Sequence, residues 1–358
     1  MEDDVLLIEK HIQESSLVQH KQAINSGFAL NTSVLMFNGE IKPIHTLTPG
    51  EQLMGDDNTP RSVVAIQRIP SPSFYRIKQI KGTDYTINQD NFISLKLSRV
   101  KASTMICGKK YVKNDIVDIT LQDYLNLSRN KRNDLKAYKT AVDFSFQKHL
   151  KLNPYVFGMW IIDATETNLS EISVHDLDIL AALLADLDKE QMKLEFIRDN
   201  RFQIVLNNEK NFYEEILQPL GIQETKFIPQ LYKTNDRNTR LQILAGIIDC
   251  EGYLNNNCYE LTIKSEKVAD DIVFITLSLG LYASKNEQKQ KQYYRIIISG
   301  DLSQIPTKTR RIKERKQIKN ILHTGFTVNQ LNEVNECVKI TIDGNGRFLL
   351  NDFTVIHS

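Results

Sequence analysis

The spacing of hydrophobic and polar positions changes several times along the 358-residue chain. In residues 28–97, short apolar runs alternate with turn residues, including the pair Asn38–Gly39, which is typical of hairpins. Helical and strand patterns alternate in residues 154–306, and strand texture returns in residues 337–358. The pattern therefore predicts an α+β protein of two domains, in which a β-rich unit is split by an inserted α/β unit.

An apolar run that ends in an acidic residue occurs twice, at Tyr155–Asp163 and at Leu244–Asp249. A repeated unit indicates a repeated structure, and here it predicts two helices that pack side by side. Gly246 would let the backbones approach closely, with the bulky Trp160 at the corresponding position of the first copy. The two carboxylates would then meet at one end of the interface.

Carboxylates at that spacing repel each other unless a cation lies between them. Mg²⁺ suits such a site, because one or two carboxylates, waters and phosphate oxygens hold it. Metals shared by Asp163 and Asp249 could activate water for phosphodiester hydrolysis. A single apolar run ending in Asp is usually a core helix with a solvated end. Two runs, each followed by a strand-like segment, favour the metal site.

Composition places the chain among ordinary globular proteins, with 41% hydrophobic and 25% charged residues. No apolar run is long enough to span a bilayer, and the acidic start, Met-Glu-Asp-Asp, does not resemble a secretory signal. The four cysteines lack metal-ligand spacing and are expected to be reduced thiols. We therefore expect an intracellular protein of the nucleus or cytoplasm, without a membrane partner.

The net charge of +1 hides two basic stretches, at about 98–139 and 308–319, which flank the repeat. Clusters of Lys and Arg are often only solvated faces. Their position beside the repeat, with tyrosines interleaved in the first, favours phosphate contacts with DNA. The candidate DNA-binding residues are Lys109, Lys110, Arg129, Lys131, Arg132, Arg310, Arg311 and Lys313.

Residues 154–318 resemble the LAGLIDADG homing endonucleases that carry two motif copies in one chain, here Gly158–Asp163 and Leu244–Gly252. The resemblance implies a monomer that cuts both strands of a long duplex DNA site with Mg²⁺. It also implies that Asp163 and Asp249 bind the metal. Lys226 and Lys308 correspond to the basic residue that the family places near the cleavage centre in each half.

Residues 27–95 and 337–358 resemble the Hint splicing domain of inteins, of the vacuolar ATPase and mating-type-switch type. Splicing in that family uses a nucleophile at the first position, a histidine in a second conserved block, and a final asparagine after a histidine. This chain has Gly27 first, Asn91 in the block Asn88–Asn91, and Ser358 last, and it keeps only His357. The resemblance therefore implies a Hint domain that cannot splice.

Three interpretations stay open: a free-standing endonuclease that lost splicing, an intein precursor trapped by substitutions, and a DNA-binding relative without catalysis. The expected segments follow the two resemblances. They are an N-terminal extension or residual host sequence at 1–26, the Hint domain in two parts at 27–97 and 321–358, a basic DNA-recognition segment at 98–150, and the endonuclease domain at 151–320.

Overall fold

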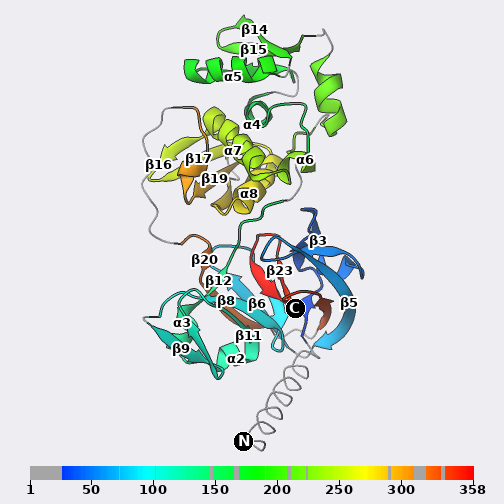
Figure 1. Cartoon of the computed structure of the whole chain (residues 1–358), viewed down its shortest axis with the longest axis vertical. Helices are drawn as coiled ribbons and strands as arrows, with labels where there is room; N and C mark the ends of the chain where they lie inside the picture. Colours follow the sequence, from blue (N-terminus) through cyan, green and yellow to red (C-terminus); the bar gives the residue numbers. More distant parts are fainter. Residues whose placement is uncertain are drawn as a thin grey trace, which may run out of the picture. The chain divides into compact units, whose positions relative to one another are not determined.

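The chain folds into two compact units, drawn in Figure 1. The first, here called the β unit, comprises the residues up to Thr140 together with His323–Ser358, and the second, the α/β unit, is Ala141–Leu322. The predicted α+β class, with a β-rich region divided by an α/β region, is confirmed. The computed structural model describes residues 26–71, 73–100, 102–144, 148–164, 169–189, 191–207, 211–222, 225–288, 292–309, 320–331 and 335–358.

The β unit is built mainly from antiparallel strands. Its elements are β1 (Phe28–Ala29), β2 (Ser33–Leu35), β3 (Ile41–Pro43), η2 (Ile44–Thr46), β4 (Gln52–Met54), β5 (Pro60–Ser71), β6 (Phe74–Gln79), β7 (Tyr85–Asn88), β8 (Phe92–Leu97), β9 (Ser103–Ile106), β10 (Lys109–Val112), β11 (Ile116–Thr120), α2 (Leu121–Asn126), α3 (Arg129–Asp134), β12 (Leu135–Tyr138), β20 (His323–Thr324), β21 (Phe326–Leu331), β22 (Asn335–Ile342), β23 (Arg347–Leu349) and β24 (Val355–His357).

Strands from both ends of the chain share one seven-stranded sheet in the β unit. Its order is β21-β6-β7-β1-β22-β5-β4, so β1 lies between β7 and β22, with Phe28 opposite Val338. The expected turn at Asn38–Gly39 joins the hairpin β2–β3, and Gly39 has a φ of +84°, which favours glycine. The alternating apolar positions of these strands form one core, which includes Val34, Ile87 and Phe348.

The α/β unit leaves and returns to the β unit through two neighbouring strands. In the four-stranded sheet β11-β8-β12-β20, β12 precedes the α/β unit and β20 follows it. These two strands pair antiparallel, with Ala137 opposite Thr324 and Tyr138 opposite His323. The two ends of the insertion are therefore held side by side by backbone hydrogen bonds of the β unit.

The α/β unit contains two similar halves around one shared core. Each half has a motif helix, α4 or α7, followed by an antiparallel sheet, β13-β15-β14 in the first half and β16-β17-β19-β18 in the second. The elements are α4 (Pro154–Asp163), β13 (Glu171–Ser173), α5 (Leu177–Lys189), β14 (Met192–Arg198), β15 (Arg201–Leu206), η3 (Tyr213–Leu217), η4 (Gln218–Leu220), α6 (Gln230–Lys233), α7 (Arg237–Glu251), β16 (Tyr253–Asn255), β17 (Cys258–Ile263), α8 (Glu266–Ser278), β18 (Tyr282–Gln288), β19 (Tyr293–Ser299) and η6 (Leu302–Gln304).

Local sequence signals fix where the two motif helices begin. Asn153 caps α4 by accepting the backbone N–H of Tyr155 at 2.9 Å, and Pro154 occupies the first helical position. Asp236 caps α7 by accepting the N–H of Thr239 at 2.7 Å. Helix α4 is apolar and buried from Tyr155 to Ile161, whereas α7 begins with polar residues and is buried continuously from Ile243 to Asp249.

Candidate catalytic centres

Helices α4 and α7 pack against each other through two glycines. A Cβ built on Gly158 would lie 2.2 Å from the carbonyl oxygen of Ile243, and one built on Gly246 would lie 2.1 Å from that of Tyr155. Only glycine fits at either position, since the backbones approach too closely for a methyl group. The small residue of α4 at this interface is Gly158, two residues before Trp160, which corresponds to Gly246 in the repeat.

Asp249, at the end of α7, is 8% exposed, and both of its carboxylate oxygens accept hydrogen bonds. Its Oδ2 accepts from the Tyr155 hydroxyl at 2.9 Å and from the Lys308 backbone N–H at 2.6 Å. Its Oδ1 accepts from the Thr309 hydroxyl, with the Thr309 N–H at 3.5 Å. Burial and the Asp249 carboxylate raise the pKa of Tyr155, so this phenol stays a donor.

Asp163, at the end of α4, lies in a more open place. It is half-buried, and among the described residues its carboxylate accepts one hydrogen bond, from the Ser173 backbone N–H of β13 at 2.5 Å. Cys250 lies near both acids: burial first, then the charges of Asp163, Glu251 and Asp249, raise the pKa of its thiol to about 12. The fold thus brings the two predicted carboxylates to one region of the α/β unit.

Lys226 lies at the carboxyl end of α4. Its ammonium donates to the carbonyl oxygens of Ile161, at 3.2 Å, and of Ala164, and it lies 5.8 Å from the centre of the Trp160 ring. The last carbonyls of a helix lack partners within the helix, so a cation is stabilising there. The first predicted lysine therefore stands beside the helix end that carries Asp163.

Lys308 lies beside the other acid, and its backbone and side chain do different things. Its N–H bonds Asp249, whereas its ammonium pairs with Asp186 of α5 at 2.8 Å and lies 4.0 Å from the Tyr155 ring centre. Burial opposes ionisation of Asp186, but the hydrogen bonds and charges of Lys308 and Lys189 together outweigh it and lower the pKa of that carboxyl. Each motif acid therefore has one of the two predicted lysines next to it.

The two acids differ in their fit to a metal ion. A carboxylate offers about four lone-pair positions. Among the described residues one donor uses a lone pair of Asp163, so this carboxylate fits a Mg²⁺ ligand, whereas the donors on Asp249 occupy that carboxylate. No group of three or more His, Cys, Asp and Glu that could hold a metal occurs within the described part of the chain. Phosphate oxygens and waters would have to complete the coordination.

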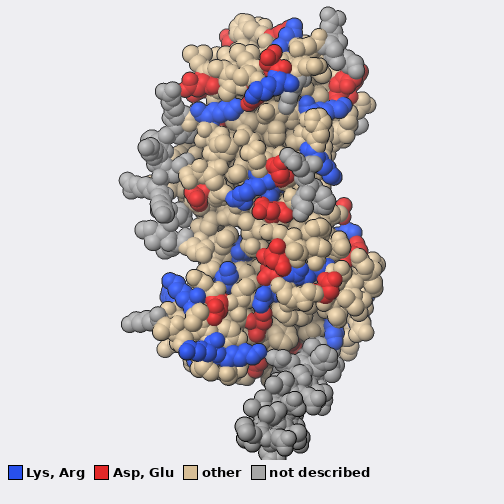
Figure 2. Space-filling view, in the orientation of Figure 1, with Lys and Arg blue, Asp and Glu red and all other residues tan. Residues whose placement is uncertain are grey.

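The DNA-binding candidates of the first basic stretch lie on the β unit. Lys109 and Lys110 are exposed on β10, and Arg129 is exposed at the start of α3. Lys131 of α3 donates to the Met105 carbonyl of β9 at 2.8 Å, and Arg132 is half-buried. Figure 2 shows separate blue patches of Lys and Arg at the lower left, among tan and red surface, where Figure 1 labels α3 and β9. Arg310, Arg311 and Lys313 lie outside the described residues.

The predicted first splicing position, Gly27, is buried and held by Asn88. The Gly27 N–H donates to Asn88 Oδ1 at 3.1 Å, and the Asn88 N–H donates to the Gly27 carbonyl at 3.1 Å. A Cβ built on Gly27 would lie 2.4 Å from the Cys337 Sγ of β22. The Cys337 side chain thus takes up the space that a side chain at position 27 would need.

The other predicted splicing positions are also in the β unit. Asn91 is 1% exposed, and both polar atoms of its side chain lack a hydrogen-bond partner among the described residues. His357 Nδ1 lies 2.8 Å from the Ser358 carbonyl oxygen, and burial lowers the pKa of its ring although Asp118 acts against this. The Ser358 N–H donates to the Gly346 carbonyl at 2.9 Å. Serine lacks the side-chain amide with which the final asparagine of the family cyclises.

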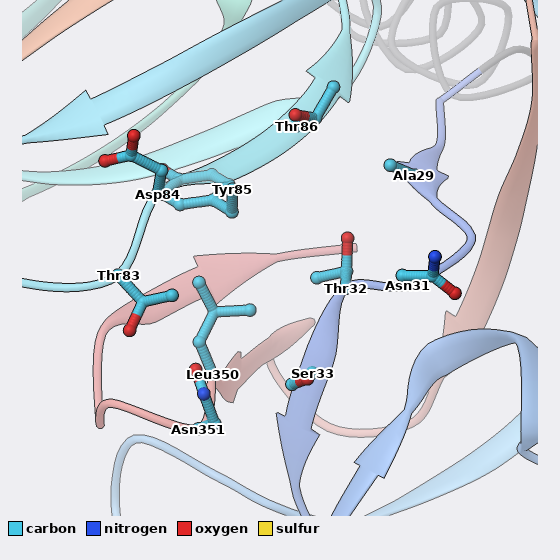
Figure 3. Close-up of a pocket in the computed structure, with 10 residues that line it drawn as sticks. All are labelled: Ala29, Asn31, Thr32, Ser33, Thr83, Asp84, Tyr85, Thr86, Leu350 and Asn351. Atoms are coloured by element: carbon cyan, nitrogen blue, oxygen red, sulfur yellow. The ribbon is translucent and has the colours of Figure 1, made fainter.

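A polar pocket of about 200 Å³ opens near the first of these positions in the β unit. Figure 3 shows that the segment after β1 lines one side and that residues around β7 and β23 line the rest. A second pocket of about 580 Å³ lies beside Phe74 and Arg76 of β6. None of the five predicted splicing positions lines either pocket.

The sequence did not indicate four residues that shape the two centres: Tyr155, Asp186 and Thr309 through their side chains, and Ser173 through its backbone N–H. Tyr155 lies two turns before Asp163 on α4, yet it bonds the acid of the other helix. Thr309 directly follows the predicted Lys308, so this neighbour is the sequence feature that could have indicated Thr309. Asp186 is part of an amphipathic helix, and nothing in its spacing sets it apart from the other acids of α5.

No helix within the described residues is both long and apolar enough to cross a membrane. In a comparison with curated proteins, the chain is 21% identical over 243 residues to the replicative DNA helicase DnaB of Mycobacterium intracellulare, covering 64% of this chain and 38% of that one. The chain thus spans well under half the length of that relative.

Two solved structures are similar over parts of the chain. The crystal structure of I-DmoI in complex with DNA and Mn covers 42% of this chain and 89% of that one, with 12% identity and a TM-score of 0.31. The gp41-1 intein covers 27% of this chain and 80% of that one, with 14% identity and a TM-score of 0.18. The family model described as Hom_end-associated Hint matches residues 27–357, which is nearly the whole sequence. The chain therefore belongs to the family of Hint domains associated with homing endonucleases.

Proposed function

We propose that the chain is a site-specific DNA endonuclease of the intein-derived LAGLIDADG type, which cuts both strands of a long duplex site with Mg²⁺, and that its Hint domain does not splice. The observation that carries the proposal is the glycine-mediated packing of α4 and α7, which brings Asp163 and Asp249 to one region with a lysine beside each. Relatives whose structures hold DNA and Mn point to the same substrate and ion class.

The residues of the two centres divide the chemistry between them. When bound, Mg²⁺ polarises the phosphodiester and makes a bound water more acidic. Asp163 and Asp249 would hold the ions, and Ser173 orients the first carboxylate through its backbone N–H. The Lys226 ammonium at the end of α4 and the Lys308 ammonium over the Tyr155 ring would offset the charge that develops on the phosphate.

The sheet β16-β17-β19-β18 offers a surface for base contacts. Glu260 of β17 accepts bonds from Tyr253 at 2.6 Å, from Asn255 at 2.9 Å and from Arg295 Nε at 3.0 Å. Tyr253 is 54% exposed and the Arg295 side chain is 44% exposed, so both present polar groups outward from a shared anchor. A β-ribbon fits the major groove of DNA, where such groups read base edges. Exposed cations of the β unit would add phosphate contacts.

The test is cleavage of a library of duplex sites in Mg²⁺ by the wild type, Asp163→Asn and Asp249→Asn. We expect cleavage to fall by about 1,000-fold or more in each variant, since a metal contact contributes several kcal/mol to the transition state. Asp178→Asn, which alters an exposed acid of α5, serves as the control and should leave cleavage unchanged. Cutting that survives in both variants would rule out the two-carboxylate mechanism.

A DNA-binding protein without cleavage is the second candidate, and the hydrogen-bonded state of Asp249 favours it. Salt-sensitive duplex binding without any Mg²⁺-dependent cutting would support this candidate. The splicing half of the proposal has its own test, in which the chain is expressed between two reporter segments. We expect only the unspliced product, because Gly27 supplies no nucleophile and Ser358 cannot cyclise. Joined reporters would contradict it.

A further inference from the structure

The two motif acids meet different surroundings although their helices are pseudo-equivalent. Within the part of the chain that the structure describes, Asp163 is half-buried and accepts from one backbone N–H, whereas Asp249 is 8% exposed and accepts from two hydroxyls and two backbone N–H groups. Hydrogen bonds to an ionised group are among the stronger ones in proteins. A cation that approaches Asp249 must therefore displace donors that one approaching Asp163 does not meet.

The donors on Asp249 come from two places. Tyr155 is fully buried in α4, so its hydroxyl is fixed by the packing of the two helices. The other donors belong to Lys308 and Thr309, which follow η6, and we name this two-residue segment the cover. The Lys308 ammonium ties the cover to Asp186 at 2.8 Å and to the face of the Tyr155 ring. Both side chains of this ion pair are about one fifth exposed.

We propose that the cover and Tyr155 make the two carboxylates unequal ligands, so that the α/β unit binds its first divalent cation at Asp163 and a second at Asp249 only after the cover moves. This inference rests on the proposed function, since it concerns the same acids. Thr309 and Tyr155 are positioning residues in it: they act through Asp249 and set its affinity for the cation.

The anchor of the cover also indicates what displaces it. The Lys308 ammonium is paired with a carboxylate that water reaches, and a DNA phosphate is an alternative anion for it. When Lys308 exchanges Asp186 for a phosphate, the backbone donor of Lys308 and the hydroxyl of Thr309 are free to leave Asp249. The second cation would then bind only in the presence of duplex, which couples the second metal to the substrate.

The experiment uses Tb³⁺ as an oxygen-seeking stand-in for Mg²⁺ and the full-length chain without DNA. Trp160, the single tryptophan, lies three residues before Asp163 and sensitises Tb³⁺ emission. We expect two binding phases in the wild type, separated by about tenfold or more in affinity. Asp163→Asn should abolish the tight phase, and Asp249→Asn should abolish the weak one.

Variants of the cover then test the cause. Thr309→Val and Tyr155→Phe each remove one donor to Asp249, and each should tighten the weak phase by about tenfold. Thr309→Ser keeps the hydroxyl and should match the wild type, while Asp186→Asn should tighten the weak phase by loosening the anchor. The unfolding midpoint of every variant, followed by Trp160 fluorescence, confirms that it folds.

Several outcomes would overturn the proposal: equal affinities in the wild type, a tight phase that survives Asp163→Asn, identical titrations for Thr309→Val and Thr309→Ser, or no sensitised emission at all. The titration contains no DNA, so it is independent of cleavage. A protein that shows two unequal phases but never cuts DNA would refute the proposed endonuclease and leave the inequality of the two acids standing.

Discussion

The β unit and the α/β unit differ in which of their predicted functional residues are present. In the β unit, three of the four positions predicted to carry splicing hold residues other than those that the resemblance implies, yet the strands around them form a packed core. In the α/β unit, both motif acids persist and lie near one another with a lysine beside each. The residues that hold a fold together are largely not those that react, so a fold can outlast its chemistry.

The packing around Gly27 shows how the β unit accommodates a glycine at the predicted first splicing position. Cys337 fills the space beside the glycine, and Asn88 holds the glycine backbone from both sides. Asn91 is the exception, because its buried amide has no partner among the described residues.

The largest predicted effect is on the stability of the α/β unit, through the two glycines between α4 and α7. We expect Gly158→Ala or Gly246→Ala to lower its free energy of unfolding by about 3 kcal/mol or more, since each new methyl meets a backbone carbonyl. The better helix propensity of alanine offsets only about 1 kcal/mol of this. Denaturant unfolding followed by Trp160 fluorescence measures it, with Ala181→Met on the exposed face of α5 as control. Unchanged unfolding would mean that the helices are farther apart.

The next largest predicted effect separates the catalytic role of Lys226 from its role as a cap of α4. Lys226→Met should slow cleavage by about 100-fold, because it removes the cation beside the Asp163 helix end, and should cost about 1 kcal/mol of stability. Lys226→Arg keeps the charge and should recover most of the stability. If single-turnover cleavage of Lys226→Met equals that of the wild type, the lysine is only a helix cap.

A smaller predicted effect concerns the packing of Gly27 against Cys337 in the β unit. Gly27→Ala should destabilise the protein by about 1–3 kcal/mol, because its Cβ would lie 2.4 Å from the Cys337 sulfur. Cys337→Ala removes that sulfur, so the double variant should recover about 1 kcal/mol relative to the sum of the two single variants. A double-mutant cycle from chemical denaturation measures this coupling. Strict additivity would show that the glycine and the cysteine do not share space.

The smallest effect is a dependence on pH. Burial holds the pKa of His357 below its usual value of 6.5, so the unfolded chain binds a proton there more readily than the folded one. Stability should therefore fall as the pH drops from above 6.5 through the lowered pKa, and level off below it. Urea unfolding of wild type and His357→Phe across this range tests the sign. His323, whose pKa burial also lowers, adds a loss of the same direction in both proteins.

The sequence predicted the order and type of the structural units better than the contacts between side chains. Period-two runs and the tandem apolar motifs indicated a split β-rich unit and a paired-helix insertion, because hydrophobic spacing sets secondary structure directly. The role of Gly158 at the interface was not predicted, since counting residues back from Asp163 does not reveal which side of α4 faces α7. Rotation of a helix about its axis depends on the whole core.

The contacts on Asp249 lay beyond sequence reasoning for a related physical reason. Tyr155, Thr309 and Asp249 come from three separate segments, and only the crossing of α4 over α7 with the return of the chain after η6 joins them. Lys226 and Lys308 were named through resemblance, and the structure places each near one acid. Their catalytic roles stay predictions until cleavage is measured.

Because β12 pairs with β20, the α/β unit is inserted into the β unit at a single junction. Thr140 and His323 stand at adjacent ends of a closed backbone ladder, so the β unit needs only a short turn between them to complete its sheet. A nuclease gene could therefore enter or leave a host domain at this one junction without disturbing either core. The same junction offers a place to graft an unrelated domain whose own termini lie close together.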